Sequence, residues 1–203
     1  MTARRLGCMT TPAQGNLLPP EALYACDNGK FGKGWPGAEK WAAGLKGTTQ
    51  RYGPGRCLWA AAPDVPFDAA GTLRESRPWL AYIRSLGIPA AFCAQDGSEH
   101  GLIPWDDFDV FFVAGTTAWK LSYTAAELAD EAHARGKAVH LARVNSRKRL
   151  AHGITIGAET ADGTYVAFGP VKNLARLQRF QADLQWREPT GVQFDLLDVL
   201  RSA

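Results

Sequence analysis

Short apolar runs that end abruptly in polar or glycine residues recur along the whole 203-residue chain. They stand at residues 22–26, 57–62, 89–94, 109–114 and 138–143, with weaker ones at 4–9 and at 156–161 or 164–168. Segments with apolar residues at near-helical spacing lie between or after them, at 71–87, 124–136 and 171–186. Such alternation is typical of a parallel sheet with helical crossovers. We therefore predict an α/β fold, a small (β/α)8 TIM-like barrel that is either complete or incomplete, because 203 residues is near the lower limit for eight units.

Length and composition favour a single domain over residues 1–203, since 46% of the residues are hydrophobic and no linker interrupts the pattern. No apolar run approaches the roughly 18 residues of a membrane span. The two arginines near the N-terminus are not followed by the apolar stretch of a secretory signal, so we expect a cytoplasmic protein without a membrane partner. The net charge of +3 permits an anionic partner without requiring one.

The four cysteines, Cys8, Cys26, Cys57 and Cys93, are far apart and form no C-x-x-C motif. This spacing indicates neither a zinc site nor a disulfide framework, and we expect no metal and no other cofactor. Three of the cysteines lie inside apolar runs, which favours a role as small buried hydrophobic residues.

Polar side chains follow the predicted strands at the point where each strand ends. Asp27, Asp64, Gln95 and Gly115 each come at or just after the end of an apolar run. In a parallel barrel the carboxyl ends of the strands meet at one rim, and that rim carries the active site. The sequence therefore predicts one shared site built from these strand ends.

A basic polar segment follows the run at 138–143, and we expect it to be a loop that anchors phosphate groups. The candidate contacts with a nucleic acid are Arg143, Asn145, Ser146, Arg147, Lys148 and Arg149. A solvated helix face is the alternative interpretation of such a cluster.

A glycine-rich loop at 32–37 adds Lys30 and Lys33 as further candidate phosphate contacts. Its string GKGWPG satisfies G-x-G-x-x-G, but Trp35 and Pro36 occupy positions where a dinucleotide-binding helix would begin. We interpret it as a surface loop, on which solvated lysines are the commoner finding.

Six segments, taken in order, resemble the deazapurine-DNA transglycosylases of phages and bacteria, which are relatives of tRNA-guanine transglycosylase. These segments are CDNGKF (26–31), PDVPFDAAGTL (63–73), CAQDG (93–97), FVAGTTAWKLS (112–122), VHLARVNS (139–146) and GAETADGT (157–164). The resemblance covers roughly residues 6–175. It implies a (β/α)8 barrel with pentosyltransferase activity that exchanges guanine in DNA for a 7-deazaguanine base.

The resemblance also implies roles for two aspartates. Asp162, in ADGT, matches the nucleophile that forms a covalent aspartyl-sugar intermediate, as in retaining glycoside chemistry. Asp27, in CDNG, matches the second aspartate, which would take the N9 proton of the incoming base. Asn28 and Lys30 depart from the family's Asp-Ser-Gly-Gly pattern, which puts the neighbouring contacts in question. On the string alone, the Asp-Gly pair at 162–163 would be interpreted as a turn.

Recognition of a guanine-like base needs acceptors for N1–H and the 2-amino group and donors for O6. By resemblance, Asp64 supplies the acceptors and Gln95 a donor, and the backbone N–H groups of Gly115 and Thr116 complete the recognition of O6. A turn or capping role is the alternative for Asp64, and Asp68 and Asp96 are the neighbours that could take its place. Because the target base must be unstacked, aromatic side chains should receive it, and Trp35, Trp119 and Tyr123 are the candidates. For Trp119 and Tyr123 a position in the buried core is the default interpretation.

The segment after Asp162 contains none of the zinc-ligating cysteines of the tRNA enzymes, which favours DNA over tRNA as the partner. The co-substrate would be a 7-deazaguanine base (preQ0-like), with its 7-substituent, the DNA context and the oligomeric state left open. Two alternatives from other classes remain. One is an N-glycosidase or sugar hydrolase that delivers water to the intermediate, and the other is a non-catalytic nucleic-acid-binding barrel.

Overall fold

The structure is a computed structural model that describes residues 7–14, 17–19 and 21–187. Its centre is a sheet of seven parallel strands in which each strand pairs with the next along the chain, in the order β1-β2-β3-β4-β5-β6-β7. The strands are β1 (Cys8–Thr10), β2 (Tyr24–Cys26), β3 (Cys57–Ala61), β4 (Ala90–Ala94), β5 (Val110–Val113), β6 (Ala138–Leu141) and β7 (Thr160–Ala161).

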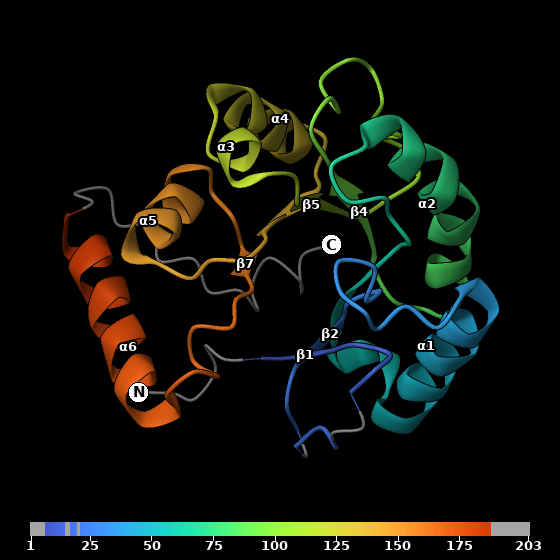
Figure 1. Cartoon of the computed structure of the whole chain (residues 1–203), viewed down its shortest axis with the longest axis horizontal. Helices are drawn as coiled ribbons and strands as arrows, with labels where there is room; N and C mark the ends of the chain where they lie inside the picture. The colour runs from blue at the N-terminus through green and yellow to red at the C-terminus, as the bar shows by residue number, and fades with distance from the viewer. Residues whose placement is uncertain (1–6, 15–16, 20, 188–203) are drawn as a thin grey trace.

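Helices connect the strands and lie outside the curved sheet (Figure 1). They are α1 (Ala38–Tyr52), the 3-10 turn η1 (Pro54–Arg56), α2 (Ala69–Ser85), α3 (Thr117–Lys120), α4 (Tyr123–Ala134), α5 (Arg147–Thr155) and α6 (Pro170–Arg187). The fold is therefore α/β, an incomplete (β/α) barrel, as the alternation of strands and helices predicts. Within the described residues the sheet has β1 and β7 as its two ends.

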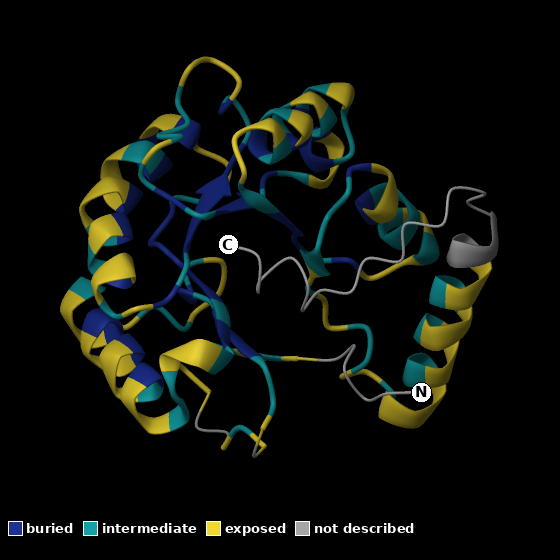
Figure 2. Cartoon of the chain, turned by 180° about the vertical axis from the view of Figure 1, so that it is seen from behind, coloured by how far each residue is buried: buried dark blue, intermediate teal, exposed yellow. Residues whose placement is uncertain are grey.

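Successive side chains of each strand point to opposite faces of the sheet and so divide the core into two layers. The strands form the buried centre of the molecule in Figure 2. The outer layer packs against α1, α2 and α4 and includes Tyr24, Ala60, Phe92, Phe111, Val139 and Leu141. The inner layer lies in the concave side of the sheet and includes Ala25, Trp59, Ala61, Ala91, Cys93, Phe112 and Ala142. Cys26, Cys57 and Cys93 are buried free thiols, which confirms their predicted role as small core residues.

Three helices, α1, α3 and α5, do not follow from the sequence pattern. Helix α3 has only four residues, too few to show a helical spacing. Helix α1 contains Gly44 and Gly47, which are poor helix formers, and these obscure the apolar spacing of its buried Trp41 and Leu45. Helix α5 occupies the segment predicted as a basic loop, and this prediction is wrong. Gly153 is its buried residue, while Leu150 is half-buried against the core and Ile154 is exposed, so this helix contributes few apolar side chains to the core.

The helix predicted over 124–136 begins one residue earlier, at Tyr123. Ser122 caps it, because its hydroxyl accepts a hydrogen bond from the N–H of Ala125 at 3.2 Å. Across the described part of the chain, none of the helices combines the length and the apolar character that crossing a membrane requires.

Candidate functional site

The residues that follow β2, β3, β4, β6 and β7 come together at the carboxyl edge of the sheet. The parallel pairing of consecutive strands places these ends on one side, as the sequence pattern predicts. Asp27 directly follows β2, Gln95 directly follows β4 and Asp162 directly follows β7, while Asp64 comes three residues after β3. The site is therefore built from side chains that follow several different strands.

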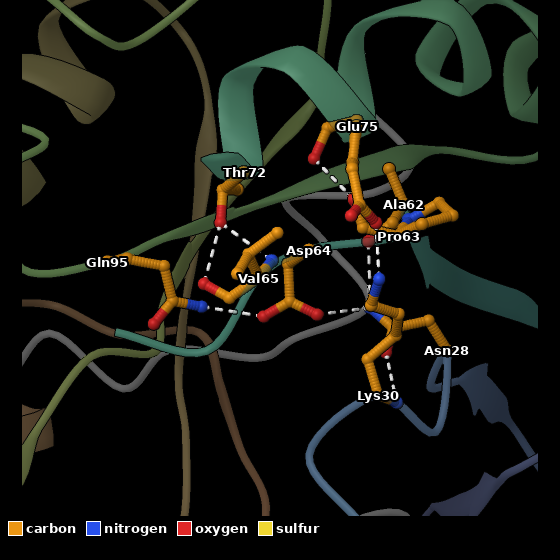
Figure 3. Close-up of polar contacts among 10 residues, drawn as sticks. Asn28, Lys30, Ala62, Pro63, Asp64, Val65, Thr72, Glu75 and Gln95 are labelled. Atoms are coloured by element: carbon orange, nitrogen blue, oxygen red, sulfur yellow. Dashed lines mark hydrogen bonds and ion pairs between the residues drawn. The ribbon is translucent and has the colours of Figure 1, made fainter. Parts of the chain in front are cut away.

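Asp64 is the centre of a buried polar network, shown in Figure 3. Its Oδ1 accepts a hydrogen bond from the amide of Asn28 at 2.9 Å, and its Oδ2 accepts one from the amide of Gln95 at 2.6 Å. The second N–H of Asn28 donates to the carbonyl of Ala62 at 2.8 Å. Asn28, which departs from the family pattern, thus fixes the position of Asp64.

Burial raises the pKa of Asp64 to about 6, and the charge of Asp27 adds to this rise. The hydrogen bond from Asn28 and the nearby ammonium of Lys30 act in the opposite direction. The carboxyl is ionised at neutral pH, and each of its oxygens has a further lone pair to offer to a ligand.

Asp162 is held by two hydrogen bonds that both end on Oδ1. The N–H of Arg143 donates to this oxygen at 2.8 Å, and Nε2 of His140 lies 3.2 Å from it. Because a carboxylate can only accept, Nε2 carries the proton of this contact, and Nδ1 of His140 lies 2.8 Å from the hydroxyl of Thr160. Within the described residues, Oδ2 of Asp162 accepts no hydrogen bond.

The pKa values of Asp162 and Asp27 are displaced in opposite directions. Burial acts to raise the pKa of Asp162, but the hydrogen bond and charge of His140, the N–H of Arg143 and the Lys120 ammonium lower it below its ordinary value. Burial raises the pKa of Asp27, and the charge of Asp162 raises it further, against hydrogen bonds from the backbone of Gly29 and Asn28. One carboxyl is thus stabilised as an anion while its neighbour is stabilised as an acid.

Gly115 and Thr116 do not offer their N–H groups to a ligand, contrary to the role predicted for them. The N–H of Gly115 donates to the Gln95 side chain at 3.1 Å, and that of Thr116 donates to Asp96 at 2.7 Å. Asp96 also accepts from the hydroxyl of Thr116 at 2.6 Å, so Asp96 braces this loop. A Cβ on Gly115 would lie 2.5 Å from the Trp119 ring, so the packing of that ring requires the glycine.

The other aspartate that sequence reasoning could confuse with Asp64 also has a structural role. Asp68 caps helix α2, since its side chain accepts a hydrogen bond from the N–H of Gly71 at 2.9 Å. Asp64 is therefore the aspartate after β3 that lies in the polar network.

Arg143 and Arg149 are half-buried and bind other parts of the chain, although the sequence predicts that they contact phosphate. The guanidinium of Arg143 donates to the carbonyl of Gly115 and lies 4.3 Å from the ring centre of Phe31. That of Arg149 donates to the carbonyl of Arg143 at 2.9 Å and to the hydroxyl of Thr117 at 3.3 Å. Both side chains are committed to internal contacts.

The neutral members of the predicted phosphate site are also engaged locally. Asn145 accepts a hydrogen bond from the N–H of Tyr165 at 3.1 Å, and Ser146 caps helix α5 by accepting from the N–H of Arg149. The Lys30 ammonium forms an ion pair with Glu75 and lies over the ring of Trp35. The positions of these three side chains are therefore explained by contacts within the protein, without a bound nucleic acid.

Three of the predicted cations remain on the surface. Lys33 and Lys148 are exposed. Arg147 is partly exposed and lies 4.0 Å from Asp183 of helix α6, a distance that corresponds to a weak surface ion pair.

The aromatic surface of the site differs from the predicted one. Trp119 is buried and donates to Glu99 at 3.0 Å, so it is the core aromatic residue that the default interpretation expects and not a stacking surface. Trp35 packs against Trp41 of helix α1. Tyr123 is 90% exposed at the start of helix α4.

Phe31 and Phe67 are the aromatic side chains that stand at the site, and sequence reasoning missed both. They are 58% and 48% exposed, and their rings pack edge to face with centres 6.0 Å apart. The Arg143 guanidinium lies against both rings. The sequence does carry a signal for both, because each is an aromatic residue in the polar loop that follows a strand end.

Two of these residues have backbone conformations that are uncommon outside glycine. Phe67 has a φ of 68° and Arg143 a φ of 57°. Such conformations cost about 1–3 kcal/mol each and concentrate at functional sites, where the surrounding structure holds them in place.

His140 is the third site residue that the sequence interpretation passed over. It is 2% exposed on the inner face of β6, packed between Trp59 and Phe112 at ring-centre distances of 4.5 and 4.4 Å. The sequence signal that indicates His140 as a site residue is a histidine within the apolar run of a strand. Among the described residues, no group of three His, Cys, Asp or Glu side chains could hold a metal ion, and the expected lack of zinc stays a prediction.

Comparisons with known proteins leave the family open. No family model and no curated protein matches the chain. Among solved structures it is similar to the Bacillus subtilis YkuI protein, which has an EAL domain and was solved in complex with its substrate c-di-GMP and calcium. The identity is 12% and the TM-score 0.45, over 91% of this chain and 56% of that one, so this chain spans little more than half the length of that structure.

Proposed function

We propose that the chain is a pentosyltransferase that exchanges guanine in DNA for a 7-deazaguanine base, with Asp162 as nucleophile and Asp27 as general acid and base. The observation that carries this proposal is that Asp27 and Asp162 follow strands at the same edge of the sheet and that, within the described residues, Oδ2 of Asp162 accepts no hydrogen bond. The opposite displacement of the pKa values of the two carboxyls supports it. Double displacement at a glycosidic carbon needs an ionised carboxylate on one side and a proton donor on the other. The substrate class in this proposal comes from the resemblance of the motifs around both aspartates to those of deazapurine-DNA transglycosylases.

In the first step, Oδ2 of Asp162 attacks C1′ of the deoxyribose, a C–O bond forms and the C1′–N9 bond breaks. The bonding electrons leave with N9 of guanine, which takes the proton held by Asp27. In the second step, the Asp27 carboxylate removes the N9 proton of the incoming base. N9 then attacks C1′, and Asp162 leaves as a carboxylate. Asp27 therefore ends the cycle protonated, as it began.

The network around Asp64 suits recognition of a base that presents donors. Its oxygens would accept from N1–H and the 2-amino group, while Asn28 and Gln95 hold the carboxylate in place. Phe31 and Phe67, which are about half exposed at the site, would stack on a flipped base. The partners would be DNA and the free base in the cytoplasm, that of the host if a phage encodes the chain.

The test is incubation of the purified protein with guanine-containing oligodeoxynucleotides and each of three bases: 7-cyano-, 7-aminomethyl- and 7-amidino-7-deazaguanine. Mass spectrometry of the nucleosides and of the released bases should show equal amounts of guanine released and deazaguanine incorporated. Release of guanine without incorporation would instead indicate a hydrolase. Binding without either product, unchanged in Asp162→Asn, would indicate a non-catalytic binding module.

A further inference from the structure

Residues 142–144 form a turn that holds Asp162 twice. The N–H of Arg143 donates to Oδ1 of Asp162 at 2.8 Å, and the N–H of Val144 donates to the backbone carbonyl of Asp162 at 2.6 Å. Arg143 adopts its φ of 57° in the middle of this turn. Because this conformation is unfavourable for arginine, other contacts must hold the turn in place.

The two carbonyls of the same turn are each bound by a cation. Nζ of Lys120 donates to the carbonyl of Ala142 at 2.9 Å, and the guanidinium of Arg149 donates to the carbonyl of Arg143 at 2.9 Å. In a trans peptide unit the C=O and the following N–H point in opposite directions. Each cation therefore directs one N–H of the turn at Asp162, and its charge polarises that peptide unit so that the N–H becomes a stronger donor.

Lys120 has no exposed surface, although burying an ammonium group is costly. Burial lowers its pKa to about 8, with Arg143 and Arg149 adding to the effect and Asp162 and Asp96 opposing it. An apolar side chain would fill the same space without this cost. A requirement for a positive charge at the 142–144 turn explains why an ammonium group is buried there.

We propose that Lys120 and Arg149 are positioning residues for Asp162. Their cations bind the carbonyls of Ala142 and Arg143, and so direct the N–H of Arg143 at the carboxylate of Asp162 and the N–H of Val144 at its backbone carbonyl. The consequence for base exchange rests on the proposed function. The effect on the Asp162 carboxyl does not, because it concerns the protein without substrate.

The test compares Lys120→Met with Lys137→Met in the full chain. Lys137 is a matched control, since its Nζ also donates to a backbone carbonyl, that of Phe108 at 2.8 Å, but it precedes β6 at the opposite end of the strand. The titration of Asp162 is followed by NMR with carbon-13 in the aspartate carboxyls, and the resonance is assigned by its loss in Asp162→Asn. The midpoint should move upward in Lys120→Met and stay at the wild-type value in Lys137→Met.

Arg149→Met provides a second variant at a partly exposed position, in case Lys120→Met does not fold, and it should shift the midpoint in the same direction. An unchanged Asp162 midpoint in the folded variants, or an equal shift in Lys137→Met, would overturn the inference.

If the wild type exchanges bases, the acid limb of the pH–rate profile should shift upward in Lys120→Met and kcat should fall roughly 10- to 100-fold, because misplacement by about 1 Å can cost about 100-fold. If the wild type shows no exchange, the proposed function fails while the NMR titration still decides the role of Lys120.

Discussion

Nε2 of His140 lies 3.2 Å from Oδ1 of Asp162, and this contact joins the inner face of β6 to the residue that follows β7. It occupies the same oxygen that the Arg143 N–H holds at 2.8 Å. The carboxylate is thus fixed through one oxygen, which leaves the other for chemistry.

Asp162→Asn should reduce base exchange by at least about three orders of magnitude, comparable to the loss of other covalent nucleophiles. The amide oxygen can still accept from Arg143, so the fold and DNA binding should persist. The measurement is single-turnover exchange, together with a search for a denaturant-resistant protein–DNA adduct in the wild type. Asp68→Asn is the control, because asparagine caps a helix as well as aspartate does and this variant should keep full activity. Near-normal exchange by Asp162→Asn would refute the assignment.

His140→Phe should move the acid limb of the pH–rate profile upward. Phenylalanine keeps the packing against Trp59 and Phe112 but cannot donate to Asp162, and the His140 hydrogen bond and charge are the contacts that most lower the pKa of that carboxyl. Asp162 would then be protonated, and inactive, at a higher pH than in the wild type. Measurement of kcat between pH 4 and 8 checks this, and an unchanged acid limb would show that His140 does not tune the nucleophile.

Asp64→Asn should flatten the pH dependence of stability in the acid range. The pKa of Asp64 is raised from 3.8 to about 6 in the folded protein, so the folded state binds this proton more tightly than the unfolded state does. The contribution of Asp64 to stability is complete below about pH 4 and is lost as the pH rises through about 6, by a few kcal/mol at most, since one pH unit is worth about 1.4 kcal/mol. Urea denaturation between pH 4 and 7 measures it. The exposed Asp130→Asn should keep the wild-type slope, and an equally steep slope in Asp64→Asn would contradict the prediction.

Neutralising Arg147 and Lys148 together should weaken DNA binding and reduce the slope of log affinity against log salt by roughly one for each phosphate group that the variant no longer binds. These side chains remain on the surface of helix α5, whereas Arg149 is bound to the Arg143 carbonyl. The matched control is Lys40→Gln with Lys46→Gln, which removes the same charge from the exposed side of helix α1. Equal effects in both pairs would indicate a dependence on net charge and not on a binding surface.

Phe67→Gly should keep the stability within about 1 kcal/mol of the wild type while impairing use of the base. Glycine adopts a φ of 68° without strain, but it increases the freedom of the unfolded chain and removes the ring that packs against Phe31 and Arg143, so the effects on stability offset one another. Loss of a stacking surface is worth about 1–3 kcal/mol per base, so KM for the base should rise roughly 5- to 150-fold. Thermal unfolding and steady-state kinetics test the two effects separately. Phe168→Ala, at a side chain that is 83% exposed, is the control that should change neither.

The strand ends could be predicted from the sequence because parallel strands with buried faces give continuous apolar runs with abrupt ends. Asp27, Asp64, Gln95 and Asp162 lie at such ends, and the structure places them at one edge of the sheet. Their hydrogen-bond partners could not be predicted in this way. The pairing of Asn28 with Asp64 joins residues 36 positions apart, and no local pattern encodes it.

The basic segment shows a different limit of sequence reasoning. Six polar residues from Arg143 to Arg149 resemble a phosphate site, but the guanidinium of Arg149 donates to the main-chain carbonyl of Arg143. Composition indicates that cations are present and does not indicate which of them reach solvent.

Cys93 is buried on the inner face of β4, close enough to the aspartates of the site to feel their charges. Burial raises the pKa of its thiol well above the ordinary value, and the charges of Asp64, Asp27 and Asp162 raise it further. A thiol held in its protonated form is a poor nucleophile. In the proposed reaction, the electrophilic sugar carbon would therefore be attacked by the Asp162 carboxylate and not by the Cys93 thiol. The aspartates that would carry the reaction thus also prevent the sugar from forming a thioether with the protein.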